Sequence, residues 1–290
     1  MDDKPGNAFL LAYFRTEDEA LHLAVSEDGL AWTALNDNRA VLRADVGNRS
    51  IRDPFLRRGA DGYFHLLSTD SWSSAGILHA RSPDLVDWEP WAVLPVMAGV
   101  PDTHCAWAPE FFWDAGRGVY LVFCSSASEL DPGYKRIWYA ETVDFRRFTP
   151  PAVLFDPGHS VIDATLVEHR DAFYLVYKDE RGENRHGTDF KAICVAAGAT
   201  PAGPFTPEAC LVTPPLTEGP TVFRAGDRWL LLYDFFLDRR WGASESSDLI
   251  HWEPLGDLVV PEGARHGTVF PVAREVWENL RARHARRPVQ

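Results

Sequence analysis

The fold is decided by the stretch at 82–88, SPDLVDW, because its pattern Ser/Thr-x-Asp-x-x-x-Trp/Phe recurs along the chain. The other copies are SEDGLAW at 26–32, TVDFRRF at 142–148 and SSDLIHW at 246–252, with a degenerate copy, ATPAGPF, at 199–205. Successive copies start 47 to 60 residues apart. Each follows an apolar, β-rich run, and a polar turn before an aromatic residue is typical of a hairpin between strands. Five such units indicate a repeat architecture.

A second series of motifs falls between these copies. It consists of RDPF at 52–55, WAPE at 107–110, IDAT at 162–165, EGPT at 218–221 and HGTV at 266–269. Another apolar, β-rich run, such as VYLVFCSS, follows each of the first four motifs. Each repeat therefore reads as four strands, which is the blade unit of a β-propeller.

The two ends of the chain predict how the ring closes. SEDGLAW has no second-series motif before it, and HGTV has no repeat motif after it. The N-terminal strands FLLAYF and ALHLAV would therefore complete the blade whose inner strand is HGTVFPV, which leaves no free sheet edge. We predict an all-β, five-bladed propeller of four-stranded antiparallel blades, closed by this pairing. It would form one domain over 1–290, with a short C-terminal helix at about 273–287. The alternative is a long β-sandwich with chance repeats.

The composition argues against several partner classes. The formal net charge is −13, whereas nucleic acid and anionic membranes both require a positive protein face. The four widely separated cysteines form no C-x-x-C pair, which favours buried free thiols over disulfides or a zinc site. The acidic N-terminus lacks the apolar stretch of a signal peptide. We expect a cytoplasmic monomer or weak oligomer with no membrane partner, or a secreted protein if a leader has been removed.

Four carboxyl groups and one imidazole are predicted to converge on the propeller axis. The inner strand of each blade lines the central channel, so Asp53, Glu110, Asp163, Glu218 and His266 would face one cavity. Like charges raise each other's pKa, and such clusters mark functional sites. Hydrolysis of a glycosidic bond needs this set, because one carboxylic acid protonates the leaving oxygen while a carboxylate activates water.

The five motifs, in this order and each opening a blade, resemble glycoside hydrolase family 43 over nearly the whole chain. The resemblance implies an inverting glycoside hydrolase with Asp53 as general base, Asp163 as the carboxylate that tunes the pKa of the acid and orients it, and Glu218 as general acid. It places His266 deep in the channel, near a possible structural Ca²⁺ or a water cluster, with any metal contact made through waters. No cofactor would be required. A plain core histidine is the alternative reading of His266, and Ala164 stands where many members carry Pro.

The resemblance also suggests the substrate. LAYF, RDPF, YKDE and RHG look most like the exo-acting furanosidases of that family. The predicted substrates are therefore plant or microbial glycans with terminal α-L-arabinofuranosyl or β-D-galactofuranosyl residues, with β-D-xylosyl residues also open. The candidate substrate-binding residues are Arg52, Trp72, Trp107, Glu110, Arg136, Lys178 and His266.

Three rival functions would each need different residues from those of the five motifs. A retaining propeller that cleaves fructan or sucrose carries Arg-Asp-Pro after an Asn-Asp-Pro nucleophile motif, which this sequence lacks. A phosphorolytic propeller glycosidase would need cations for phosphate, and only Arg52, Arg136 and Lys178 are candidates. A non-catalytic carbohydrate-binding propeller would not need a spaced acid and base, so the presence of both Asp53 and Glu218 speaks against it.

Overall fold

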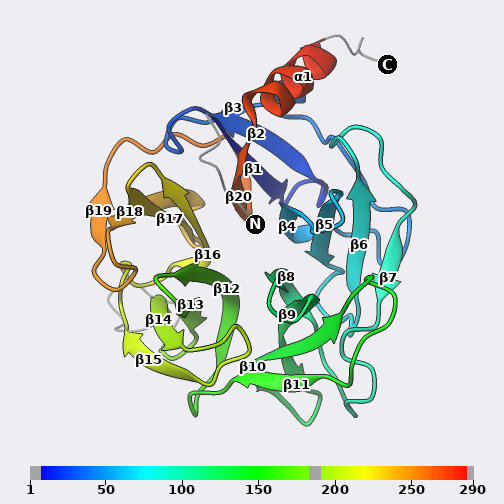
Figure 1. Cartoon of the computed structure of the whole chain (residues 1–290), viewed down its shortest axis with the longest axis vertical. Coiled ribbons are helices and arrows are strands. Elements are labelled where there is room, and N and C mark those ends of the chain that lie inside the picture. Colours follow the sequence, from blue (N-terminus) through cyan, green and yellow to red (C-terminus); the bar gives the residue numbers. More distant parts are fainter. Residues whose placement is uncertain (1–7, 183–190, 286–290) are drawn as a thin grey trace.

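Each sequence repeat forms one four-stranded antiparallel sheet, and residues 8–182 and 191–285, which the computed structural model describes, form five such blades around one axis (Figure 1). From the axis outward, the first blade consists of β20 (Ala264–Val272), β1 (Ala8–Arg15), β2 (His22–Ser26) and β3 (Thr33–Ala34). The second blade consists of β4 (Arg52–Arg58), β5 (Phe64–Thr69), β6 (Ile77–Ser82) and β7 (Ala92–Leu94). The third is β8 (Trp107–Asp114), β9 (Val119–Ser128), β10 (Asp131–Thr142) and β11 (Ala152–Phe155). The fourth blade consists of β12 (Val161–His169), β13 (Ala172–Asp179), β14 (Ile193–Gly198) and β15 (Phe205–Ala209). The fifth blade consists of β16 (Glu218–Ala225), β17 (Arg228–Phe235), β18 (Arg240–Ser246) and β19 (Glu253–Leu255).

The ring closes through its first blade, as the sequence predicts. β20 is the inner strand of that blade and pairs antiparallel with β1, from Ala8 opposite Val272 to Arg15 opposite Ala264. The blade therefore joins both ends of the described chain, and Figure 1 shows β1 and β20 side by side at the axis. The five-bladed, all-β prediction and its mode of closure are confirmed.

The repeat motif is a turn held by its own side chains. In the copy at 26–32, Ser26 Oγ accepts the Gly29 N–H at 2.9 Å, and Asp28 Oδ1 accepts the Leu30 and Ala31 N–H groups at 2.8 Å each. The same bonds recur in the copies that begin at residues 82, 142 and 246. Each turn joins the two outer strands of a blade, so these aspartates satisfy backbone donors.

The blades are held together by hydrophobic clusters at their interfaces. Leu10 of β1 packs with the second blade, whereas its neighbours Phe9 and Leu11 pack with the fifth. Both faces of such a strand are covered, which explains why seven consecutive residues of β1 are buried. Five clusters of this kind are found among the described residues, one between each pair of adjacent blades.

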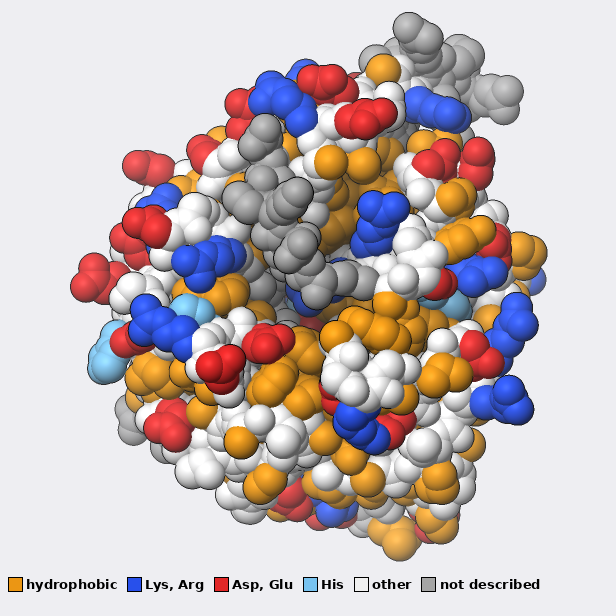
Figure 2. Space-filling view, in the orientation of Figure 1, with side chains coloured by type: hydrophobic (Ala, Val, Ile, Leu, Met, Phe, Trp, Pro, Cys, Tyr) orange, Lys and Arg blue, Asp and Glu red, His pale blue; other side chains and the backbone are white. Residues whose placement is uncertain are grey.

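One α-helix, α1 (Arg274–Ala285), follows the ring, where the sequence predicts a helix at about 273–287; positions 286–290 lie outside the described residues. Its Trp277 and Leu280 are buried in the cluster between the first two blades. Within the described part of the chain, no helix has the length and apolar character needed to span a membrane. On the face seen in Figure 2, acidic and basic side chains are interspersed, and hydrophobic side chains gather around the central hollow.

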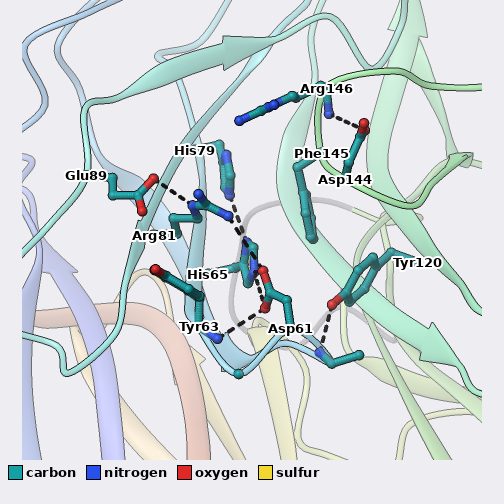
Figure 3. Close-up of polar contacts among 12 residues, drawn as sticks. Asp61, Tyr63, His65, His79, Arg81, Glu89, Tyr120, Asp144, Phe145 and Arg146 are labelled. Atoms are coloured by element: carbon teal, nitrogen blue, oxygen red, sulfur yellow. Dashed lines mark hydrogen bonds and ion pairs between the residues drawn. The ribbon is translucent and has the colours of Figure 1, made fainter.

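Two buried histidines of the second blade, His65 and His79, stack against Phe145 of the third blade (Figure 3). The rings of His65 and His79 stack at 5.3 Å, and His65 Nδ1 lies 3.0 Å from His79 Nε2. His65 Nε2 lies 3.1 Å from the Asp61 carboxylate, so His65 donates there and accepts from His79, which makes both rings neutral. Phe145 of the third blade stacks on His65 at 4.4 Å. Burial lowers the pKa of His65, and it lowers the pKa of His79 to about 3.

The two buried, neutral histidines predict that the folded protein loses stability in acid. An unfolded histidine binds a proton near pH 6.5, whereas folded His79 does not until about pH 3, so its contribution to stability is complete above 6.5 and is lost as the pH falls. We expect His79→Gln, which keeps a donor for His65, to flatten the pH dependence of the free energy of unfolding by about 1.4 kcal/mol per pH unit between pH 6 and 4. Urea unfolding at a series of pH values measures this slope. His251→Gln, at an 86% exposed side chain, should leave it unchanged, and equal slopes in all three proteins would contradict the prediction.

Candidate active site

The four inner strands β4, β8, β12 and β16 open with the same local backbone. Each contains a bulge, and the second residue of each motif has a left-handed conformation: Asp53 (φ 47°), Ala108 (45°), Asp163 (53°) and Gly219 (60°). This conformation costs a residue other than glycine about 1 kcal/mol or more, and such strain collects at functional sites. Asp53 and Asp163 therefore occupy equivalent positions of the second and fourth blades.

Side chains of neighbouring blades hold these strained positions. Thr69 Oγ1 donates to Asp53 Oδ2 at 2.8 Å and accepts the Ala108 N–H at 2.8 Å. Ser125 Oγ accepts the Asp163 N–H at 3.0 Å, and Asp163 Oδ2 in turn accepts the Gly219 N–H at 3.2 Å. The N–H groups of Ala108, Asp163 and Gly219 are thus each accepted by a side chain of the preceding blade, so contacts between blades hold three of the four strained positions.

Two cations face Glu218, the first residue of β16. Its Oε2 lies 2.8 Å from Lys178 Nζ, and its Oε1 lies 3.5 Å from Arg265 Nη2. Lys178 also pairs with Glu180 at 2.7 Å, and Arg265 Nε pairs with Asp234 at 2.5 Å. Glu218 keeps 24% of its side chain exposed, so the network that orients it leaves it open to a ligand.

His266 connects the two aspartates. Its Nδ1 lies 3.2 Å from Asp53 Oδ1 and 3.9 Å from Asp163 Oδ2. Burial alone would lower the pKa of this imidazole, but the Asp163, Asp53 and Glu218 carboxylates outweigh it and raise the pKa of His266 to about 9. The ring packs against Gly219, where a Cβ would come within 2.6 Å of His266 Cγ. Gly219 is therefore required both by its backbone conformation and by this contact.

The two aspartates have opposite electrostatic surroundings. Burial would raise the pKa of Asp53, yet the hydrogen bond and charge of His266, with Arg52 and Thr69, hold the pKa of Asp53 below its ordinary value. Burial raises the pKa of Asp163, and the nearby Glu218 carboxylate adds to the rise. Asp53 is therefore the aspartate that stays ionised and can accept a proton, whereas Asp163 is the one that can hold a proton near neutral pH.

The imidazolium of His266 therefore controls the ionisation of Asp53. In His266→Gln the positive charge is lost, so the pKa of Asp53 rises and the acid limb of the kcat/KM profile moves to higher pH. A pH series on wild type and variant measures the shift, and His251→Gln serves as the control. A variant whose activity falls at every pH with an unmoved acid limb would contradict this role.

Glu110 lies further along its inner strand than the motif carboxylates Asp53, Asp163 and Glu218. It occupies the fourth position of its motif, equivalent to Phe55 and Thr165, so aligning the five motifs on their polar members misplaces it by two residues. It is only 8% exposed, and burial raises the pKa of Glu110 to about 7 against the opposing charge of Arg57. Glu110 thus lies below the level at which Asp53 and Glu218 are presented.

Three predicted substrate-binding residues form one aromatic rim. The Trp107 and Trp72 rings meet edge to face at 5.5 Å, and Trp107 Nε1 donates to the Trp72 carbonyl at 2.8 Å. The Arg52 guanidinium stacks over Trp72 at 4.5 Å and pairs with Glu19 at 2.7 Å. Trp72 is 60% exposed, so an apolar platform borders the pocket. Such surfaces suit the faces of sugar rings.

Arg136 is not brought to this pocket by any contact found among the described residues. Its guanidinium lies 5.4 Å from the rings of both Tyr134 and Trp138, and it pairs with Asp156 at 3.8 Å. The sequence motifs do not single out Arg265, Asp234, Glu180 and Thr69, which contact the predicted carboxylates or the cations that pair with them. One signal was available, because Arg265 directly precedes His266 in the ARHG stretch.

A five-bladed propeller whose inner strands present carboxylates of opposed pKa beside an aromatic rim defines the class of propeller glycoside hydrolases. A family model described as "Probable glycosyl hydrolase domain", related to glycoside hydrolase family 43, matches residues 4–278. The chain belongs to this family. The resemblance drawn from the five motifs is thereby confirmed.

Individual proteins agree with this assignment. The chain is 28% identical over 185 residues to an α-L-arabinofuranosidase of Bifidobacterium longum subsp. longum; the match covers 53% of this chain and 17% of that relative's length. Its fold resembles a thermostable family-43 glycoside hydrolase (TM-score 0.60, 20% identity, 75% of each chain). It also resembles an endo-1,4-β-xylanase from Bacteroides thetaiotaomicron (TM-score 0.63, 14% identity, 90% of this chain and 93% of that one). The two structural likenesses concern the fold.

Proposed function

We propose that the chain is an inverting, exo-acting glycoside hydrolase that removes terminal furanosyl residues, with arabinofuranose the first candidate sugar. One observation carries the proposal: Asp53 is held ionised by His266 in the same pocket that presents Glu218 between two cations. Asp53 is the general base, Glu218 the general acid, and Asp163 the residue that tunes and orients Glu218.

The reaction follows from this placement. Asp53 removes a proton from a water molecule as the water oxygen attacks the anomeric carbon, and Glu218 gives its proton to the departing glycosidic oxygen. Water enters opposite the leaving group, so the configuration inverts. Lys178 and Arg265 then face the carboxylate that Glu218 has become. Asp163 accepts the N–H of Gly219, next to Glu218, and so fixes the backbone that presents the acid.

The sugar is inferred from relatives and from the sequence motifs. The Bifidobacterium longum protein named above is an α-L-arabinofuranosidase, and the sequence resembles exo-acting furanosidases. β-D-Galactofuranosyl and β-D-xylosyl residues are the next candidates. The phosphorolytic alternative loses support, because Arg52, Arg136 and Lys178 all have acidic partners.

The test is release of p-nitrophenol from α-L-arabinofuranoside, β-D-galactofuranoside, β-D-xyloside and α-L-arabinopyranoside, each with and without phosphate. We expect cleavage of a furanoside without any need for phosphate. Asp53→Asn should abolish it, whereas Asp227→Asn, at an exposed turn residue between β16 and β17, should not. Cleavage that requires phosphate, or equal rates in both variants, would overturn the proposal.

The residues around His266 do not fit a direct bond to calcium. Nδ1 is committed to Asp53, and a pKa raised to about 9 gives the ring a positive charge that repels a cation. Calcium prefers six to eight oxygen ligands. We derive no step through a metal.

We therefore expect the purified enzyme to keep its activity after treatment with EDTA followed by dialysis. The comparison is the initial rate on the best panel substrate before and after chelation. A large loss of rate that added Ca²⁺ restores would contradict this expectation.

A further inference from the structure

Two thiols lie near each other at the outer strands of the fourth blade, with Cys194 on β14 and Cys210 directly after β15. Val195 of β14 pairs with Ala209 of β15, and the next residues in this register are Cys194 and Cys210. Their Sγ atoms lie within 4.8 Å of each other. Residues opposed across an antiparallel pair have Cα separations of about 4.5–5.5 Å, within the range a disulfide requires. Side-chain rotation can therefore bring the two sulfurs together.

The two thiols differ in access and in environment. Cys210 is exposed, whereas Cys194 is buried, as the sequence analysis predicts for most of the cysteines. The Cys194 thiol lowers the pKa of Cys210 to about 7, aided by the Tyr177 hydroxyl and the charge of Arg181. The hydrogen bond to Cys210 raises the pKa of Cys194, and burial adds to the rise. Cys210 is thus the reactive thiolate and Cys194 the partner that stays protonated.

The carboxylate beside the thiols is already occupied. Asp179 accepts the Arg181 N–H at 2.8 Å and the Arg181 Nη2 at 2.6 Å, and His159 Nε2 lies 3.1 Å from it. A metal ion here would have to displace a guanidinium and then remain beside its charge. Without Asp179 the site offers two sulfur ligands, whereas structural zinc takes four ligands. The arrangement therefore favours chemistry between the thiols over metal binding.

We propose that Cys194 and Cys210 form a redox-active pair that a small disulfide such as oxidised glutathione converts to an intramolecular disulfide. The Cys210 thiolate attacks one glutathione sulfur, which forms a mixed disulfide and releases glutathione thiolate. Conversion of Cys210 to the mixed disulfide removes the thiolate that raises the pKa of Cys194, so Cys194 loses its proton to solvent, attacks the Cys210 sulfur and releases a second glutathione thiolate. Two protein thiols are oxidised, and one oxidised glutathione is reduced to two glutathione molecules.

The test is incubation of the fully reduced wild-type protein with oxidised glutathione, followed by acid quench, alkylation and peptide mass spectrometry. We expect a cross-linked pair of peptides containing Cys194 and Cys210. Cys194→Ser should instead stop at a glutathione adduct on Cys210, and Cys210→Ser should form neither product. Cys105→Ser is the matched control, because Cys105 is buried elsewhere, and it should behave as wild type.

Two results would overturn the pair. One is a glutathione adduct that persists on wild-type Cys210 as long as it does in Cys194→Ser. The other is Zn²⁺ that stays bound to the untreated reduced protein after dialysis, is lost in both Cys194→Ser and Cys210→Ser, and protects both thiols from oxidation. Circular dichroism of each variant checks that it is folded, so a failure of folding is not mistaken for either result.

Discussion

Asp53→Asn is expected to lower kcat/KM by about 10²–10⁴-fold, on substrates with good and poor leaving groups alike. An amide cannot take the proton of the attacking water, and general base catalysis contributes about this factor. The loss corresponds to roughly 3–5 kcal/mol of transition-state stabilisation. Asn can still accept the Thr69 hydroxyl and fits the left-handed backbone, so we expect little change in folding.

The measurement is initial-rate kinetics on a p-nitrophenyl glycoside and on the corresponding oligosaccharide. Asp227→Asn, in the exposed turn between β16 and β17, makes the same chemical change away from the pocket and should retain wild-type rates. A variant at Asp53 that keeps more than a tenth of wild-type activity, with its fold intact, would contradict the base assignment.

Glu218→Gln is expected to show a loss that depends on the leaving group. Without a proton donor, a sugar alcohol leaves poorly, so kcat/KM on an oligosaccharide should fall by about 10²–10⁴-fold. A dinitrophenolate departs without help, so its glycoside should lose far less. Gln keeps the size of the side chain and a carbonyl oxygen for Lys178. It removes the negative charge of the partly buried Glu218 carboxylate, which both Lys178 and Arg265 face.

Asp53→Asn should lose activity on both kinds of leaving group, whereas Glu218→Gln should lose it mainly on the poor one, and this difference distinguishes the general base from the general acid. The control is Glu253→Gln, whose rates on both substrates should match wild type. If Glu218→Gln lost equal activity on both leaving groups, Glu218 would be a binding residue or a base, and the proposed assignment of acid and base would be wrong.

Much of the fold could be predicted because the turns that separate its strands have a recognisable sequence pattern. A serine or threonine followed two residues later by aspartate closes a turn by hydrogen bonds that need no partner from elsewhere in the chain. A turn that is stabilised by its own residues can be recognised in the sequence, and the number of its copies predicts the number of blades. The ring closure was likewise readable, because the first and last segments each lacked the part that the other supplied.

The candidate site was only partly readable. Asp53, Asp163, Glu218 and His266 do meet, as the motifs predict. The bulge that opens four of the inner strands is invisible in the sequence, and it decides which residue of each motif faces the axis. For that reason Glu110 was placed level with the others, although it lies two positions deeper.

The partners of the carboxylates were harder to predict. Thr69, Glu180 and Asp234 lie on or directly after the second strands of their blades. Glu180 belongs to the YKDE stretch, but no pattern in the sequence marks these three residues as parts of the network around the carboxylates. They reach the pocket through pairing register between strands and through contacts between blades, which is long-range information. A physical reading of one sequence finds the motifs, but it does not find the network that holds them.

The most direct test of the central claim is a proton NMR time course of an aryl α-L-arabinofuranoside with the wild-type enzyme. We expect the first sugar product to be the β-anomer, which then equilibrates by mutarotation, because Asp53 delivers water opposite the departing group. First appearance of the α-anomer would contradict the account, since it would require a covalent intermediate on a carboxylate rather than a base and a water.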